Sequence, residues 1–516
     1  MRCAIRLICF ALPVMTNILP EFLKKSAGIL FSLLLWELVA LLAGPTRSVP
    51  APLEVVTTIY AARFEYLPHI VATLRSAVLG LFWGVVIGCF SAVLITVAPA
   101  LDALLAPCTF VFSIPLIILV PIIGMTSSPD AAPVICSVLL VYYPILVLVN
   151  VGLRNVPHTV MSYAKSSGAT PASILRNIRI RYALPGLAAG LEAAIPVAIL
   201  GSMLGELTGA RWGLGAYLLA IMVQANPAKE WGIFAVSAVL AGGASGLSAV
   251  VWRRLGISAT TVSPLSSASV QRLRLLIGLI VSLSLWQLVS SLMSNPFFVK
   301  RPSDIVRYLQ GYSRPEALAF VSGLGQTLEW AGIGLALGLA TGFLLALVLR
   351  LWPIFSAPLL TITFVTQAVP IVALVPLYVS IFGRGPGTTL AITVSATFFL
   401  SFASVYQGLQ RTPEAMVNFA LSAGASPLAV LRRIRIPASI PFLFAAVRLT
   451  TPRVLLGVTL AEYLATRQGL GAMLFEARGT LDFNLMWAIA LCVGGITMLF
   501  VELVRYCEHR SLARYT

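Results

Sequence analysis

Some ionisable residues of this 516-residue chain lie within or at the end of long apolar segments, where they could bind or pass a charged group; four of them occupy matching positions. Glu192 and Arg448 each stand seven residues after a proline, and Glu206 and Glu462 each stand seven residues before a Gly-Leu-Gly triplet. A charged side chain inside a membrane costs roughly 2.5–3.5 kcal/mol on insertion scales, so it needs a partner or a wet cavity. These residues are candidates for a solute pathway or its gates.

The sequence does not indicate catalysis. His69, His158 and His509 lie far apart without metal-ligand spacing, and the seven cysteines form no Cys-x-x-Cys pair. The segment most similar to a phosphate-binding loop, "GRGPGTTL" at Gly383–Leu390, lacks the lysine that such a loop requires. The sequence therefore predicts no metal, no cofactor, and a protein that is not an enzyme and does not hydrolyse ATP itself.

A basic segment occurs twice, as "AKSSGATPASILRNIRIRYALP" at Ala164–Pro185 and "ALSAGASPLAVLRRIRIPASIP" at Ala420–Pro441. In the first copy Thr170 is placed to cap a helix that starts at Pro171. One interpretation is an interfacial helix whose arginines extend toward lipid headgroups. The other is a helix to which a cytoplasmic partner docks. The near-identical duplication favours docking, because a symmetric partner would use two such helices.

Composition predicts the elements that carry these residues. Hydrophobic residues make up 59% of the chain and charged residues 10%, with a mean hydropathy of +0.96. Soluble domains carry about 25% charged residues, so a membrane protein is indicated. The net charge of +17 comes from basic residues clustered between apolar runs. That pattern is typical of cytoplasmic loops beside membrane spans and not of a nucleic-acid-binding face.

Twelve apolar segments are candidates for membrane spans, which need about 20 apolar residues. All should be helices, because every backbone polar group must be satisfied inside lipid. The candidates fall six and six: Ile29–Leu42, Ile70–Val97, Leu101–Gly124, Ala131–Gly152, Pro185–Leu207 and Trp231–Trp252, then Leu273–Leu292, Gly325–Leu351, Ile354–Phe382, Thr388–Leu409, Ile440–Ala461 and Leu485–Val504. The predicted fold class is an all-α membrane protein of about 12 transmembrane helices.

Basic residues predict the orientation of these spans. The segment Arg154–Arg181 holds five Lys or Arg residues and no Asp or Glu, and its copy near Arg432 is similarly basic. With six spans in each half, both segments fall on the same side as Lys24 and Lys25, the linker between the halves and the C-terminal tail. The positive-inside rule makes this side the cytoplasm, with both termini cytoplasmic.

The chain is a tandem repeat. A gapless shift of 256 residues gives 22 identities in the 52 positions from Ala164 to Gly215. The matched residues include glycines, prolines, arginines and Glu206 with Glu462, which shared apolar composition alone would not produce. Two halves in the same orientation imply a pseudo-two-fold axis along the membrane normal. Glycines at every fourth position, such as Gly80, Gly84 and Gly88, predict a face for close helix packing.

The pattern "A-x-S-x-G-A-[ST]-P … R-I … P", followed by "E-L-T-G-A-R-W-G-L-G" or "E-Y-L-A-T-R-Q-G-L-G", resembles the permease subunits of type I ABC importers. The similarity is greatest to the branch for nitrate, sulfonates, taurine and bicarbonate, which also contains permeases for a thiamine-precursor pyrimidine. It covers nearly all of each half from about Leu67 and Val321 onward. The resemblance implies two permease halves fused in one chain.

In this family the basic segment is a coupling helix that lies in a groove of the ATPase subunit. The family's glycine falls on Gly168 and Gly424, whereas its usual glutamate six residues earlier is replaced by Ser162 and Asn418. Ile440 replaces the leucine that usually precedes the second proline. The resemblance assigns ATPase coupling to Ala164, Gly168, Pro171, Arg176, Arg179 and Pro185, and to Ala420, Gly424, Pro427, Arg432, Arg435 and Pro441.

The resemblance implies a fused importer permease in the cell (inner) membrane, for a small anion or a thiamine-precursor pyrimidine. Its expected partners are two copies of a separate ATPase subunit and a periplasmic or extracellular solute-binding protein; homodimerisation is not required. The alternatives are an ion-coupled secondary transporter with tandem repeats, or a non-transporting membrane scaffold or receptor. Only the importer reading requires an ATPase.

Expected boundaries follow from the repeat: residues 1–66 form a tail, the first span and an outer loop, and 67–255 form repeat 1. Residues 256–320 form a linker, the seventh span and an outer loop, 321–506 form repeat 2, and 507–516 form a tail. The first 14 residues loosely resemble a signal peptide that Pro13 interrupts, so translation from Met15 is an open alternative.

Two hypotheses concern the charged residues. Glu206 and Glu462 either form a symmetric pair at the outer gate or are carboxylates at helix ends that bond to water or nearby backbone. Glu192 and Arg448 occupy equivalent positions in the two halves. They either pair across the pseudo-two-fold axis or each find a local partner.

Overall fold

The computed structural model describes residues 30–31, 33–42, 49–98, 114–224, 226–257, 280–281, 283–288, 290–292, 297–351, 359 and 369–512, and every regular element within them is helical. The first half contains α2 (Pro52–Ala61), α3 (Arg63–Val97), α5 (Leu116–Thr126), α6 (Ala131–Arg154), α7 (His158–Ser166), α8 (Pro171–Ile174), the π-helix η3 (Leu175–Arg179), α9 (Ile180–Glu206), α10 (Leu214–Gln224) and α11 (Pro227–Arg254).

The second half repeats this order. It contains α13 (Pro302–Gln310), α14 (Arg314–Leu351), α16 (Ile371–Phe382), α17 (Pro386–Gln410), α18 (Glu414–Ser422), α19 (Pro427–Val430), the π-helix η5 (Leu431–Arg435), α20 (Ile436–Leu464), α21 (Gly469–Thr480) and α22 (Phe483–Leu512). Each half therefore runs from a long helix through a half-length helix to a second long helix, a capped turn, a third long helix, a short helix and a last long helix.

Among the residues that the structure describes, eight helices are long and apolar enough to span a membrane, and they match eight of the twelve expected spans. These are α3, α6, Pro171–Glu206, α11, α14, α17, Pro427–Leu464 and the α22 stretch Phe483–Glu508. The other four expected spans lie partly outside the described residues: Ile29–Leu42, Leu101–Gly124, Leu273–Leu292 and Ile354–Phe382. Their described parts include the shorter apolar helices Leu33–Leu42, α5 and α16.

The glycine rows bring the long helices of each half into close contact, as the sequence predicts. A Cβ atom on Gly84 would collide with Val141 of α6, and the neighbouring glycines Gly80 and Gly88 face Ser137 and Ile145 in the same way. Gly334, Gly338 and Gly342 of α14 likewise face Thr393, Thr397 and the backbone at Phe402 on α17. Small residues permit this backbone approach, so the two halves share one packing scheme.

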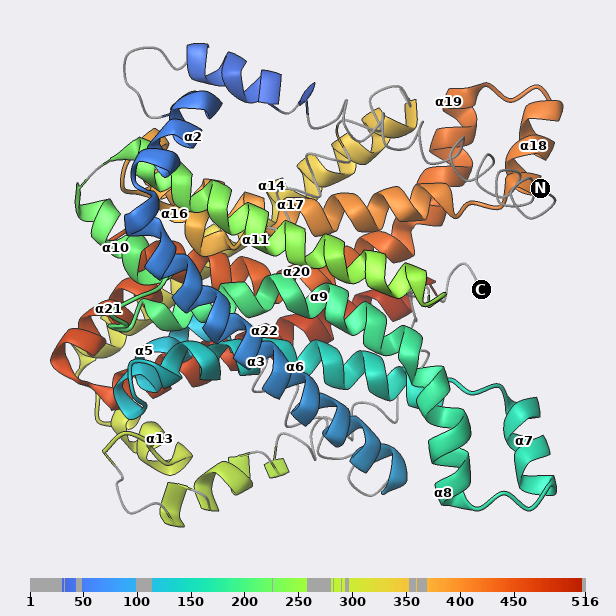
Figure 1. Cartoon of the computed structure of the whole chain (residues 1–516), viewed down its shortest axis with the longest axis horizontal. Coiled ribbons are helices and arrows are strands. Elements are labelled where there is room, and N and C mark those ends of the chain that lie inside the picture. Colours follow the sequence, from blue (N-terminus) through green and yellow to red (C-terminus); the bar gives the residue numbers. More distant parts are fainter. Residues whose placement is uncertain are drawn as a thin grey trace, which may run out of the picture.

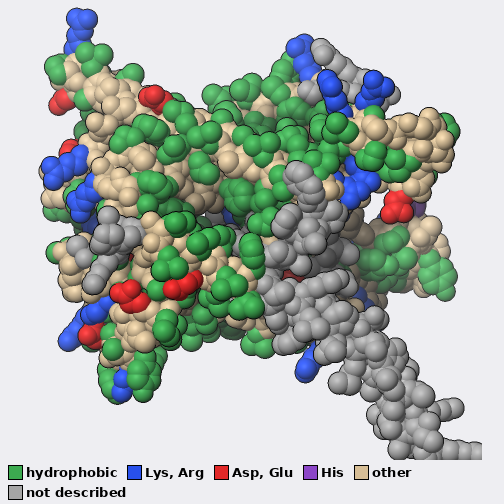
Figure 2. Space-filling model, turned by 90° about the horizontal axis from the view of Figure 1, so that it is seen from above, with side chains coloured by type: hydrophobic (Ala, Val, Ile, Leu, Met, Phe, Trp, Pro, Cys, Tyr) green, Lys and Arg blue, Asp and Glu red, His purple; other side chains and the backbone are tan. Residues whose placement is uncertain are grey.

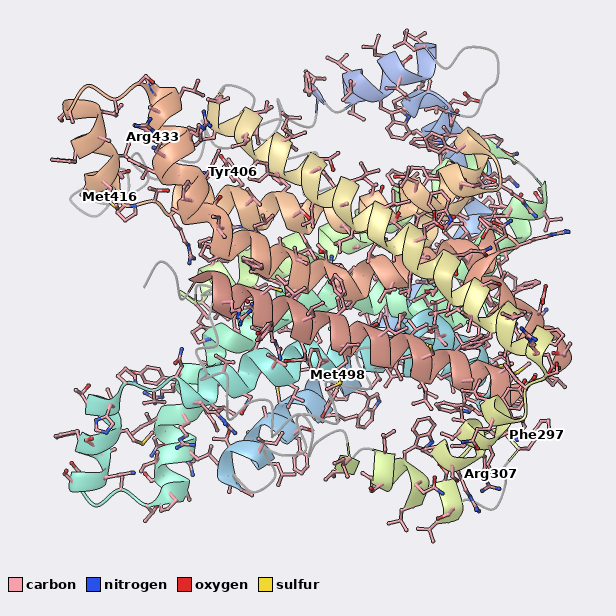
Figure 3. All side chains as sticks on the ribbon, turned by 180° about the vertical axis from the view of Figure 1, so that it is seen from behind. Phe297, Arg307, Tyr406, Met416, Arg433 and Met498 are labelled. Atoms are coloured by element: carbon pink, nitrogen blue, oxygen red, sulfur yellow. The ribbon has the colours of Figure 1, made fainter. Side chains whose placement is uncertain are left out.

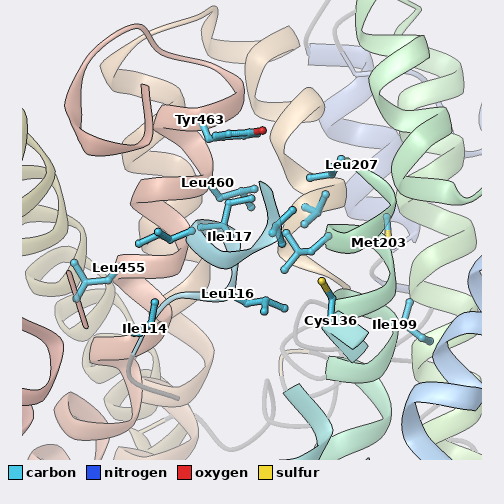
Figure 4. Packing of buried hydrophobic residues seen from close by; sticks show 14 of the residues in the cluster. Ile114, Leu116, Ile117, Cys136, Ile199, Met203, Leu207, Leu455, Leu460 and Tyr463 are labelled. Atoms are coloured by element: carbon cyan, nitrogen blue, oxygen red, sulfur yellow. The ribbon is translucent and has the colours of Figure 1, made fainter. Parts of the chain in front are cut away.

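The two halves hold each other by exchanging their half-length helices. Helix α5 packs against α20, α21 and α22 of the second half, and α16 packs against α9, α10 and α11 of the first. Figure 4 shows Ile117 of α5 between Leu460 of α20 and Met203 and Leu207 of the first half. All of these side chains belong to one buried cluster that spans both halves.

The long helices run between two ends of the molecule (Figure 1). We call these the α8/α19 end, where α7, α8, α18 and α19 project, and the α10/α21 end. In Figure 3 the labelled Met416 and Arg433 lie at the α8/α19 end, while Phe297 and Arg307 lie at the other. The two projecting pairs stand apart from each other, whereas the shared core contains the α10 and α21 residues. The halves thus converge toward the α10/α21 end.

The outer surface suits a lipid environment. Apolar side chains cover much of the face seen in Figure 2, and charged side chains gather mostly toward its two ends. Helix α3 exposes large apolar residues along its length, among them Phe82, Trp83 and Phe90. The equivalent tryptophans Trp231 and Trp487 pack against Trp36 and Trp286, with ring centroids 5.0 and 4.8 Å apart. These contacts attach the first helical segment of each half to its last span.

Candidate functional site

Each basic segment begins with a turn that only glycine adopts readily. Gly168 and Gly424 have φ angles of +75° and +82°. The N–H of Gly168 donates to the carbonyl of Lys165, and the N–H of Ala169 donates to the carbonyl of Ala164, each at 3.0 Å. This pair of bonds is a Schellman motif, which ends α7. The second half repeats it, with Ala425 bonded to Ala420 in the same way.

A new helix starts within four residues of each glycine. The Thr170 side chain accepts a hydrogen bond from the N–H of Ser173 at 3.2 Å, and the Ser426 side chain accepts one from the N–H of Ala429 at 3.2 Å. A proline follows each cap at the first helical position. Turn, cap and proline therefore recur at equivalent positions, and the predicted cap of Thr170 is confirmed.

The structure corrects the expectation that a new helix starts at Pro185, separate from the helix of the basic segment. The helix that begins at Pro171 continues to Glu206 through the π-helix η3, and its copy runs from Pro427 to Leu464 through η5. Pro185 and Pro441 lie inside α9 and α20. Membrane helices tolerate an internal proline because local π adjustments satisfy the freed carbonyls. Figure 1 shows α8 and α19 lying across the run of the spans before the chain turns into them.

The paired turns present exposed aromatic side chains that the sequence reading missed. Tyr163 and Phe419 stand one residue before Ala164 and Ala420, and their exposed fractions are 77% and 78%. Exposed large apolar side chains mark interaction surfaces when they cluster, and Phe419 lies near the exposed Met416 on α18. The sequence does contain a signal for these residues, because both positions, separated by 256 residues, hold an aromatic side chain. We call α7–α8 and α18–α19, with their connecting turns, the coupling hairpins.

The basic residues of the coupling hairpins lie mainly in solvent. Arg176 and Arg432 are exposed, and Arg179 and Arg435 are partly buried at the ends of the π-helices. Ala164 is buried, Ala420 is partly buried, and Pro171 and Pro427 are exposed. The structure thus brings the coupling residues of each half together on one projecting hairpin, apart from Pro185 and Pro441 farther along the helix.

The Glu206 carboxylate is buried and not exposed to water at a helix end. We call its set of hydrogen bonds a clasp. Its side chain is 1% exposed and accepts hydrogen bonds from Thr73 Oγ1 at 3.0 Å, Ser202 Oγ at 3.1 Å and the Gly215 N–H at 2.8 Å. The Thr73 hydroxyl itself accepts from the Leu214 N–H at 2.7 Å. The carboxylate thereby ties the Gly-Leu-Gly turn at the end of α9 to α3.

Glu462 makes the same clasp in the second half. It is 2% exposed, Thr327 Oγ1 lies 2.9 Å from both carboxylate oxygens, and the Gly471 N–H donates at 2.9 Å. A Cβ atom on Gly469 would collide with this carboxylate, as one on Gly213 would with Glu206. The repeated triplet is thus explained by local packing.

Of the two alternatives for Glu192 and Arg448, the structure shows a local partner for Arg448 and no pair across the axis. Arg448 Nη1 donates to Glu508 Oε2 at 2.8 Å, so its partner is local and lies on α22 of the same half. Glu192 is exposed, and no hydrogen bond or ion pair joins it to Arg448 in the part of the chain that the structure describes. Because the halves are equivalent, the face that carries both residues is directed at each half's own last span.

Two polar contacts join the halves near the α10/α21 end. Ser380 Oγ of α16 donates to Glu230 Oε2 of α11 at 2.6 Å. Arg478 Nη1 of α21 donates to the Tyr463 hydroxyl at 2.8 Å and to the Leu207 carbonyl of the first half at 3.4 Å. The sequence analysis did not identify these contacts, because each joins residues of different halves that are far apart in the chain. We call them the inter-half latches.

Among the residues that the structure describes, no three His, Cys, Asp or Glu side chains are placed to hold a metal ion. The geometry instead provides two equivalent projecting hairpins at one end, two equivalent clasps at the other, and a shared core between the halves. Such an arrangement can couple a movement at the hairpins to the contact between the halves.

Comparisons with known proteins agree with this geometry. The family described as "Binding-protein-dependent transport system inner membrane component" matches the chain twice, at residues 84–255 and 332–512. A probable ABC transporter permease of Haemophilus influenzae is 31% identical over 232 residues, which are 45% of this chain and 94% of that protein.

Two further relatives carry more specific names. A putative aliphatic sulfonates transport permease of Bacillus subtilis is 25% identical, over 34% of this chain and 61% of its own length. The formylaminopyrimidine transport permease of Halalkalibacterium halodurans is 27% identical, over 40% of this chain and 83% of its own length. The two family matches cover well over half of the chain, one in each half. The chain therefore belongs to the binding-protein-dependent transport system inner membrane component family, as an ABC transporter permease of the inner membrane that contains two copies of the domain.

Proposed function

We propose that this chain alone forms the complete membrane pathway of an ABC importer for a small solute, with the α8/α19 end in the cytoplasm. A separate ATPase subunit binds each coupling hairpin, and a solute-binding protein delivers the solute at the α10/α21 end. The observation that carries the proposal is the pair of equivalent coupling hairpins on one polypeptide. Two docking sites are what an ATPase dimer requires.

The sidedness follows from charge. The coupling hairpins and the ends of α11 and α22 carry clustered arginines, among them Arg176, Arg254 and Arg432, whereas the arginines at the α10/α21 end are interspersed with acids such as Glu65 and Asp304. The positive-inside rule directs the clustered arginines to the cytoplasm. Both chain termini would then be cytoplasmic. The membrane-embedded acids Glu206 and Glu462 are already satisfied by neighbouring donors, so the arrangement favours an ATP-driven importer over an ion-coupled carrier.

The arrangement supports a mechanism of alternating access. The shared core joins the halves toward the α10/α21 end, while the coupling hairpins stand apart at the other. Closure of an ATPase dimer would draw the hairpins together and require the inter-half latches to open, which would admit the solute from outside. The solute itself is proposed only as a class, a small anion such as nitrate, a sulfonate, taurine or bicarbonate, or a pyrimidine.

Co-purification tests the proposal. The tagged chain is expressed in its native cells, and capture of an ABC ATPase subunit is measured. Replacing both Tyr163 and Phe419 by alanine should abolish capture, because their side chains form the exposed apolar part of both hairpins. The matched control is Phe64→Ala, since Phe64 is 74% exposed on α3 at the opposite end. A chain that captures no ATPase, or captures it equally well without both aromatics, contradicts the proposal.

A further inference from the structure

Arg453 is a cation in the middle of a membrane span. It lies 17 residues after the start of α20 at Ile436 and 11 residues before its end at Leu464. At about 1.5 Å per residue, these separations are about 26 and 17 Å, which exceed the length of an arginine side chain. Snorkelling to either surface is therefore ruled out, and the guanidinium needs another source of solvation.

No protein group in the described part of the chain supplies that solvation. Arg448, five residues earlier, pairs with Glu508, but no hydrogen bond, ion pair or ring contact reaches Arg453. Arg453 is partly buried, neither in the fully buried core nor fully exposed. An unpaired arginine at the bilayer centre is costly, and its usual location is a water-filled cavity on an ion or solute path.

The helix face that carries Arg453 is directed at the space between the halves. At 3.6 residues per turn, Arg453 lies between the directions of Gly457 and Leu460. Gly457 faces Ala396 and Ile392 of α17 and Ile371 of α16, and α16 packs against the first half. Leu460 lies beside Ile117 of α5 in the shared core (Figure 4). Arg453 is therefore directed between α16 and α5 and not outward to lipid.

Exposure along this face changes at Arg453. Leu449, one turn toward the α8/α19 end, is 53% exposed, whereas Leu460, two turns the other way, is fully buried. Arg453 thus lies where this helix face passes from exposed side chains to the buried core that the two halves share.

The type of residue at the position of Arg453 differs between the two halves. The residue equivalent to Arg453 is Val197, which lies one residue after Pro196 as Arg453 lies after Pro452. The helix scaffold is thus the same, and only the second half contributes a cation. Since the first half forms the same helix with valine, the arginine is not needed to fold it.

We propose that Arg453 binds the transported solute, and that this solute carries an oxyanion such as nitrate or a sulfonate. The inference rests on the proposed importer function and narrows its substrate class. A guanidinium presents two parallel N–H donors that match two oxygens of such a group. In a poorly hydrated site the oxyanion takes the place that a carboxylate partner of Arg453 would occupy. The contact therefore favours an oxyanion over an uncharged solute such as a pyrimidine.

Binding to the purified full-length chain in lipid nanodiscs tests the inference without the ATPase. The probes are nitrate, ethanesulfonate and bicarbonate, with riboflavin as an uncharged control. Arg453→Lys should retain at least part of the oxyanion binding, and Arg453→Val should weaken it at least about tenfold, which corresponds to about 1.4 kcal/mol. Arg453→Val copies the residue of the first half and should fold. Arg384→Gln, which removes an exposed arginine outside the span, is the charge-matched control.

Uptake by the assembled importer separates this inference from the proposed function. With ATPase capture and basal ATP hydrolysis unchanged, Arg453→Val should lose oxyanion uptake. Wild-type oxyanion binding in Arg453→Val, or binding of only the uncharged probe by the wild type, would overturn the role of Arg453 and leave the importer function intact. Failure of the wild type to capture an ATPase would overturn the importer function, and the nanodisc measurement would still decide whether Arg453 binds an oxyanion.

Discussion

The positive φ angles of Gly168 and Gly424 decide the geometry of the coupling hairpins. A Cβ atom at either position would meet open space, so only the backbone conformation demands glycine. Left-handed backbone costs an ordinary L-residue roughly 1–2 kcal/mol, whereas asparagine tolerates it better.

We therefore expect Gly168→Val and Gly424→Val to lower ATPase capture and uptake strongly, because the turn that orients α7 against α8 would be strained. Gly168→Asn and Gly424→Asn should retain most activity. Membrane insertion, measured by the yield of detergent-purified chain, should be unchanged in all four variants. Normal uptake by both valine variants would contradict this account of the turn.

The buried carboxylates lead to a second prediction at the same scale. Glu206→Gln and Glu462→Gln replace one accepting oxygen by an NH2 group that cannot accept from the Gly215 or Gly471 N–H. An unsatisfied buried group costs about 1–3 kcal/mol, so each variant should lower the unfolding temperature of the purified chain. Thr73→Val and Thr327→Val remove the other half of each clasp and should act similarly. Unchanged stability in all four variants would contradict the clasp, and unchanged ATPase stimulation by the solute-binding protein would argue against a gate role.

At the scale of elements, close packing by glycine distinguishes positions on one helix. On α14, a Cβ atom at Gly338 would collide with Thr397 of α17, whereas one at Gly332 would meet nothing. Gly338→Ala should destabilise the chain by about 1–3 kcal/mol through overpacking, while Gly332→Ala should be neutral or slightly stabilising. Thermal unfolding in detergent measures both. Equal effects of the two substitutions would refute the packing explanation.

The sequence predicted the long helices well because a membrane span is encoded in composition over about 20 residues. The glycine rows and the matched turns were predictable for a different reason. Their residue types are specific to one local conformation or to close helix packing. Helices α7, α10, α18 and α21 were missed because they are short and lie outside that signal. Pro185 was expected to start a helix, but the π-helix one turn earlier allows the chain to pass through it.

The charged pair was wrong for a geometric reason. Equal depth follows from the 256-residue shift, but equivalent residues meet across a two-fold axis only if their helix face is directed at that axis. The face of Arg448 is directed at α22, where Glu508 lies. Arg453, five residues later, is on a different face, and only the packing of Gly457 and Leu460 reveals its direction.

For the whole molecule, the inter-half latches should control access from outside. Ser380→Ala with Arg478→Met removes the side-chain donors that hold α16 to α11 and α21 to the first half. Weaker closure should favour the outward-open state, so ATP hydrolysis should depend less on the solute-binding protein. The measurement is ATPase activity of the reconstituted importer with and without that protein. Undiminished dependence would show that the latches do not restrain opening.

The central claim is that one chain supplies both docking sites of an importer. Native mass spectrometry of the complex purified through a tag on this chain tests it most directly. The mass should equal one copy of the 55.0 kDa chain plus two copies of the ATPase subunit. The double variant Gly168→Val with Gly424→Val should be recovered without any ATPase subunit. A complex that contains two copies of this chain, or a single ATPase subunit at saturation, would contradict the account.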